Sequence, residues 1–224
     1  MDPTILGRDF RTLVDGLERA DGISTNGRDG WEPWPDGLSV ADLVAKEPTY
    51  AKVPSEILEF ARAAGYLRAY LEWWEGGPED KPSSDDEGGA INFSVAPLSP
   101  TQEGDPLHEA GYTAQGPSFW RIDEISVDVV EDASGAVTAV DSMADGDPEV
   151  SPAELSPLAW LGRAIATAGL EISFDAETLE EERSFYDSLD DWQAARLLRR
   201  IRELGIVPAE TARRYYPELV DLLV

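Results

Sequence analysis

The sequence predicts an α+β protein, in which a small antiparallel β-sheet with a central β-hairpin packs against several α-helices. Three observations indicate this class: apolar residues at helical spacing, stretches of alternating apolar and polar residues, and glycine- or proline-containing turns between them. The 224 residues fit one domain, 1–224, which is large enough to bury its own core. The expected strands are residues 90–96, 119–130, 136–140 and 170–174.

The first expected helix spans residues 3–20, where Leu6, Phe10, Leu13 and Leu17 fall on one face. A loop follows that contains Trp31 and Trp34, each next to a proline. These tryptophans are candidate partner contacts if they are exposed, because tryptophan is enriched at interface hot spots. If they are buried, the loop is instead a rigid cover over the core.

A short helix is expected to begin after Ser39 and to end before Pro48. Ser39 and Asp42 have the spacing of a capping box. A longer helix is expected over residues 54–75, because Ile57, Phe60, Ala64, Leu67 and Leu71 follow one another at helical spacing. Residues 76–89 are polar and rich in glycine, and they are expected to form a flexible loop.

The β-hairpin is expected within residues 119–140. Ile125, Val127 and Val129 alternate with polar residues, which is the period of a half-buried strand. The sequence from Asp132 to Gly135 supplies a turn with a glycine where a positive φ is usually needed. One face of this hairpin is therefore expected to be apolar and the other to carry carboxylates.

The C-terminal part, about residues 190–224, is expected to be helical and is rich in arginine. Between Trp192 and Tyr216 there are six arginines and two glutamates, a local charge of +4. These arginines could pair with residues 180–182 of the same chain, or with the acidic surface of a second copy in a homodimer. The arginines are Arg196, Arg199, Arg200, Arg202, Arg213 and Arg214.

The composition excludes several classes of function. A net charge of −27 disfavours direct binding to nucleic acid and to anionic membranes. The chain has no cysteine and one histidine, His108, which excludes thiolate chemistry and metal sites that need two histidines. No phosphate-binding loop or nucleophile elbow occurs, and no cofactor is expected. A basic n-region and long apolar runs are also missing, so a cytoplasmic protein is expected.

Carboxylates are the candidate functional groups. Residues 121–150 contain nine acids and one arginine, and residues 171–191 repeat that balance. Carboxylates spread over a rigid surface can imitate nucleic-acid phosphates, or can complement a basic cleft on another protein. The candidate partner-binding residues are Asp123, Glu124, Asp128, Glu131, Asp132, Asp145, Asp147 and Glu149, together with Trp31 and Trp34.

These features favour an acidic interaction or inhibitor protein, of the immunity or nucleic-acid-mimic type, that occludes a basic site on a partner such as a nuclease. One alternative is an enzyme that uses carboxylates and a divalent cation at Asp145, Asp147 and Glu149. The other is a structural or assembly protein whose acidic surface reflects a salt-adapted or GC-rich host.

Overall fold

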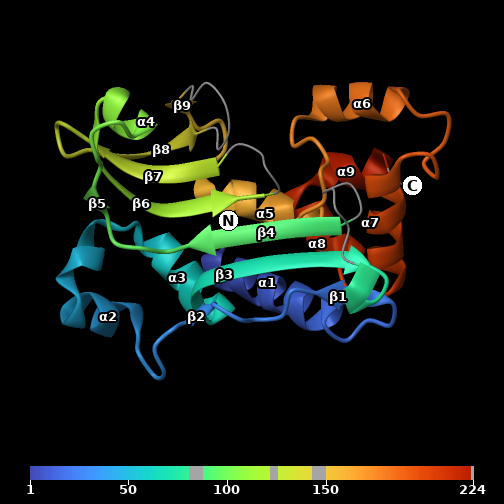
Figure 1. Ribbon diagram of the computed structural model, residues 1–224, viewed down its shortest axis with the longest axis horizontal. Coiled ribbons are helices and arrows are strands. Elements are labelled where there is room, and N and C mark those ends of the chain that lie inside the picture. The colour runs from blue at the N-terminus through green and yellow to red at the C-terminus, as the bar shows by residue number, and fades with distance from the viewer. Residues whose placement is uncertain (81–87, 122–125, 143–149, 223–224) are drawn as a thin grey trace.

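A computed structural model describes residues 1–80, 88–121, 126–142 and 150–222 (Figure 1). Its strands pair antiparallel in one sheet with the order β1-β3-β4-β6-β7-β8-β9, while β2 also pairs with β3 and β5 with β6. The predicted α+β class is therefore confirmed. The strands are β1 Ile23–Thr25, β2 Glu32–Pro33, β3 Tyr66–Glu75, β4 Gly88–Ser94, β5 Ser99–Pro100, β6 Tyr112–Trp120, β7 Ser126–Asp132, β8 Val137–Ser142 and β9 Ser151–Pro152.

The helices α1, α3 and α5 cover one face of this sheet. Figure 1 shows α1, α3 and α5 behind the strands, with α7, α8 and α9 gathered at one end of the molecule. The C-terminal part is helical, as expected. The helices are α1 Pro3–Leu17, α2 Val40–Lys46, α3 Ser55–Ala64, α4 Pro106–Glu109, α5 Pro157–Ala166, α6 Ala176–Ser184, α7 Gln193–Glu203, α8 Ala209–Tyr215 and α9 Pro217–Leu222, with 3-10 turns at Pro48–Lys52 and Pro78–Asp80.

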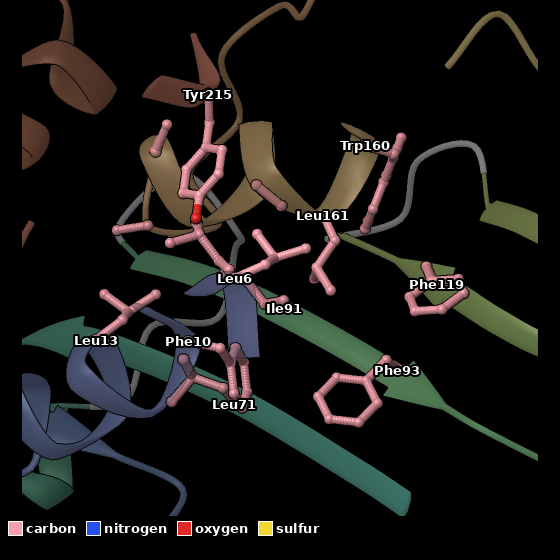
Figure 2. Close-up of a cluster of buried hydrophobic side chains, with 14 of the residues drawn as sticks. Leu6, Phe10, Leu13, Leu71, Ile91, Phe93, Phe119, Trp160, Leu161 and Tyr215 are labelled. Atoms are coloured by element: carbon pink, nitrogen blue, oxygen red, sulfur yellow. The ribbon is translucent and has the colours of Figure 1, made fainter. Parts of the chain in front are cut away.

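The main core lies between the sheet and α1, α3 and α5. The apolar stripe of α1 points at β4, so that the ring of Phe10 lies 5.2 Å from that of Phe93 in an edge-to-face contact (Figure 2). Phe60 of α3 meets the same Phe93 ring at 5.0 Å. Edge-to-face pairs are a favoured geometry for buried aromatic rings. The apolar residues whose spacing predicted the first helix are thus the residues that face the core.

The expected helix over residues 54–75 is wrong in its second half. The helix α3 ends at Ala64, because Gly65 adopts a φ of 88° that closes it in the left-handed conformation. From Tyr66 onward the chain is the strand β3. In β3, Leu67, Ala69, Leu71 and Trp73 are all buried. Leu67 and Leu71 are four residues apart, so they fit the spacing of a helix and of a strand equally well.

Two expected strands are also corrected. Residues 119–130 do not form one strand, because Phe119 and Trp120 end β6 whereas Ser126 begins β7. Residues 170–174 are not a strand. Two of their backbone carbonyls instead accept hydrogen bonds from the buried side chain of Arg121.

Two local predictions are confirmed at the level of hydrogen bonds. Ser39 accepts from the N–H of Asp42, and the Asp42 carboxylate accepts from the N–H of Ser39, which is a complete capping box. The turn before β8 uses Gly135 at a φ of 83°. Residues 81–87 of the expected loop lie outside the described residues, and Gly88 and Gly89 already belong to β4. Among the helices that the structure describes, none has the length and apolar character needed to cross a membrane.

Candidate interaction surface

The hairpin does not present Asp128 to solvent as expected. Asp128 is only 9% exposed, and the hydroxyl of Ser142 on β8 donates a hydrogen bond to its carboxylate. The reason is that β7 is an interior strand and that the short helix α4 covers its second face. There Leu107 packs with Val130 and Val140 in a small separate core. The face opposite the main core is therefore covered at this end of the sheet.

The next two acids of the hairpin are engaged within the chain. Both carboxylate oxygens of Glu131 accept from Lys52, at 2.6 and 2.7 Å. The carboxylate of Asp132 closes the turn by accepting from the hydroxyl and the N–H of Ser134 and from the N–H of Ala136. These hydrogen bonds, that from the Ser134 hydroxyl first, lower the pKa of Asp132. Asp132 thus has a local structural role whether or not a partner binds.

The other predicted carboxylates belong to two segments, residues 122–125 and 143–149. Asp123, Glu124, Asp145, Asp147 and Glu149 lie outside the described residues. The cation site expected at the last three therefore lies outside the described residues as well. Within the part of the chain that the structure describes, no group of three or more acidic or histidine side chains could hold a metal ion.

Both candidate tryptophans pack against the protein. Trp34 is buried, and its indole N–H donates to the carbonyl of Leu38. Trp31 is half-buried; its indole N–H donates to the carbonyl of Tyr70, and its ring lies 4.8 Å from that of Tyr66. Of the two alternatives for this loop, the rigid cover over the core describes these positions better.

Several arginines of the C-terminal part form ion pairs inside the chain. Arg199 binds Asp190 at 2.8 Å, Arg200 binds Glu75 at 2.8 Å, and Arg214 binds Asp9 at 2.7 Å. None of these partners belongs to residues 180–182, which were one of the two alternatives for these arginines. Arg200 and Arg214 thus connect α7 and α8 to β3 and α1 of the same chain.

The second acidic segment, residues 171–191, contains carboxylates that are exposed to solvent. Helix α6 begins at the cap residue Asp175 and buries only Leu179 among its nine residues. Figure 1 shows it at the margin of the molecule, beyond α9. Glu177, Glu180 and Glu181 are exposed, and their carboxylates form no ion pair with any residue that the structure describes.

Phe185, immediately after α6, is the most exposed large apolar side chain described, at 83%. Its neighbours fix this position. The ring of Tyr186 stacks on that of the buried Trp192 at 5.5 Å, and Arg183 donates to the carbonyl of Tyr186 at 2.8 Å. Since Tyr186 is held against the core, the preceding residue is left pointing outward. We call the exposed side chains of Glu177, Glu180, Glu181, Phe185 and Asp187 the α6 surface.

The charge of residues 171–191 is visible in the sequence, whereas the exposure of the Phe185 ring is not. A lone phenylalanine in a helical, acidic segment ordinarily marks the buried side of that segment. Only the anchoring of Tyr186 reverses this expectation. Comparisons of the chain with protein-family models, with curated proteins and with solved structures find no match.

Proposed function

We propose that this protein is an acidic interaction protein that binds and occludes a basic site on a partner protein through its α6 surface. The observation that carries the proposal is the 83% exposure of Phe185 beside carboxylates that no described residue neutralises. An exposed aromatic ring costs free energy in water, and that cost is recovered when a partner's pocket buries it. The exposed carboxylates of the α6 surface favour partners whose pocket has a basic rim.

The whole-chain charge supports the same kind of partner. A net charge of −27 creates a field that attracts basic proteins over distances longer than any contact. Such steering raises the association rate and weakens as salt screens it, whereas the buried aromatic contact mainly slows dissociation. Nuclease active sites, which are basic because they bind phosphates, have the required chemistry. The proposed activity is therefore inhibition by occlusion.

The test is a calorimetric and kinetic titration against basic nucleases of the same organism at low and high salt. With the partner found, Phe185→Ala is expected to weaken binding roughly tenfold to a hundredfold, mostly through faster dissociation. A triple variant of the α6 surface is expected to lower the association rate and its salt dependence. It combines Glu177→Gln, Glu180→Gln and Glu181→Gln.

A matched control changes the net charge by the same amount elsewhere. The three control residues are exposed and lie outside the α6 surface; they are Asp29, Asp36 and Glu103. The triple variant that combines Asp29→Asn, Asp36→Asn and Glu103→Gln should leave the dissociation rate unchanged. Equal effects of the two triple variants would show that only the total charge matters. Tight binding that ignores salt, or no binding to any basic nuclease, would refute the proposal.

A further inference from the structure

Three side chains form a row across the centre of the sheet, on the face away from the main core. Tyr70 on β3 pairs with Asn92 on β4, and Asn92 in turn pairs with Trp120 on β6. Their sequence neighbours Leu71, Ile91 and Phe119 are buried in the main core. Because side chains alternate between the faces of a sheet, Tyr70, Asn92 and Trp120 share the other face. No described helix lies in front of β3 and β4 in Figure 1.

The amide of Asn92 is unusual for its position. The residue is only 3% exposed, yet neither the nitrogen nor the oxygen of its side chain has a hydrogen-bond partner among the described residues. A buried amide without partners is destabilising, because it has lost its water and gained nothing in return. A group of this kind in a folded protein calls for a specific reason, and a ligand that supplies the missing partners is one.

Two aromatic rings stand over this amide. The strands that carry Tyr70 and Trp120 are separated by β4, so their backbones are about 10 Å apart. Their ring centroids are nevertheless only 5.8 Å apart, with the planes tilted by 32°. The rings therefore lean toward each other above Asn92. Both keep an outward surface, with Tyr70 41% and Trp120 37% exposed.

We propose that Tyr70, Asn92 and Trp120 form a binding site for a neutral saccharide, which reaches the amide when the two rings rotate apart. The flat C–H faces of a sugar ring pack against aromatic rings. An amide offers a donor and an acceptor side by side, which matches two adjacent hydroxyls. A few polar groups among aromatic side chains are the usual composition of a small-molecule site.

The charge of the protein argues for a neutral ligand. A phosphate- or carboxylate-bearing ligand would be repelled by the net charge of −27, whereas a neutral sugar is not. In the register of β3 and β4, the basic side chain nearest to Tyr70 on the same face is Arg68, two residues along β3, and it faces Glu32 at 3.8 Å. The site shares no residue with the α6 surface, so it is independent of the proposed inhibition.

The test follows the side-chain amide of Asn92 and the indole N–H of Trp120 by NMR. Cellotetraose, xylotetraose and chitotetraose serve as probes at millimolar concentration, with adenosine and a blocked dipeptide amide as the competing ligand classes. At least one saccharide is expected to shift both signals in a saturable way. No shift with any saccharide, or a saturable shift with adenosine or the dipeptide alone, would overturn the proposal.

Two variants distinguish a binding role from a structural one. Asn92→Leu keeps the size of the side chain and removes the unpaired amide, so the melting temperature should stay the same or rise while saccharide affinity falls at least tenfold. Trp120→Ala, a change at an exposed ring, should also lose binding and provides the test if Asn92→Leu does not fold. Phe185→Ala, on the other surface, should bind saccharide like the parent. Parental affinity in both Asn92→Leu and Trp120→Ala would refute the site.

Discussion

The Nη1 atom of Arg121 lies 2.6 Å from the carbonyl oxygen of Leu170, and it also donates to the carbonyl of Ile172 at 2.8 Å. The guanidinium lies over the ring of Phe174 at 4.3 Å. At 1% exposure, Arg121 is one of the largest fully buried side chains of the protein. A side chain thus supplies hydrogen-bond donors to two carbonyls of residues 170–174, a segment that the sequence predicts to pair as a strand.

Replacement of Arg121 should therefore be costly. In Arg121→Met, the buried carbonyl of Ile172 loses its donor, and the carbonyl of Leu170 keeps only the N–H of Ile172. We expect the free energy of unfolding to fall by roughly 2–5 kcal/mol. Urea denaturation followed by tryptophan fluorescence measures this loss. Arg8→Met, at an exposed position of α1, is the control and should change stability by less than about 0.5 kcal/mol. Equal stabilities of the two variants would show that Arg121 does not hold residues 170–174.

Gly7 allows the close approach of α1 and α3. A Cβ atom at this position would lie 2.6 Å from both the nitrogen of Ala64 and the carbonyl oxygen of Phe60. Gly7→Ala gains about 1 kcal/mol of helix propensity, but overpacking costs about 1–3 kcal/mol. Because the obstructing atoms are backbone, we expect a net loss of stability. Arg8→Ala, one residue away and exposed, should instead be neutral or stabilising, and a stabilised Gly7→Ala would contradict the packing described here.

The turn at Asp132 predicts a dependence of stability on acid pH. Its folded pKa is lowered by hydrogen bonds from Ser134 and Ala136, whereas an unfolded aspartate titrates near pH 3.9. The contribution of Asp132 is therefore present above about pH 4 and is lost as pH falls through the folded pKa. The urea midpoint of the parent should exceed that of Asp132→Asn at pH 6, and the difference should shrink at pH 2 to 3. Asp29→Asn, a change at an exposed aspartate, is the control and should have a urea midpoint close to that of the parent at pH 6.

The cation hypothesis for Asp145, Asp147 and Glu149 has its own test. If these residues bind Ca²⁺ or Mg²⁺ only in the folded state, an ion concentration 100 times the dissociation constant stabilises the fold by about 2.7 kcal/mol. The melting temperature should then rise with the ion and return to its starting value with EDTA. Asp145→Asn combined with Asp147→Asn should abolish the rise. An equal rise with NaCl at matched ionic strength would show that screening of the net charge is the cause.

Local sequence signals predicted the parts of the fold that local interactions control. The capping box of Ser39 and Asp42, the glycine turn before β8 and the apolar stripe of α1 each depend on residues within a few positions of one another. Residues 66–75 were misassigned because their pairing is not local. The strand β3 is fixed by hydrogen bonds to β1, β2 and β4, which lie elsewhere in the sequence.

The candidate surfaces were harder to predict than the fold. Sequence alone located both acidic segments, but it could not tell a solvated carboxylate from one that a neighbour engages. Asp128 and Glu131 meet Ser142 and Lys52 only because β8 and the turn after α2 are folded against β7. The row of Tyr70, Asn92 and Trp120 was invisible, since strand register alone brings its members together.

The sequence by itself determined the α+β class, the net charge of −27 and the chemistries that are excluded by the lack of cysteine and the single histidine. Tertiary structure alone decided that Asp128 is buried and that Phe185 is exposed. It also decided that the side-chain amide of Asn92 has no hydrogen-bond partner in the described part of the chain. The physical reason is that composition and short-range periodicity are properties of the chain. Burial and hydrogen-bond satisfaction, in contrast, depend on which distant residues the fold brings into contact.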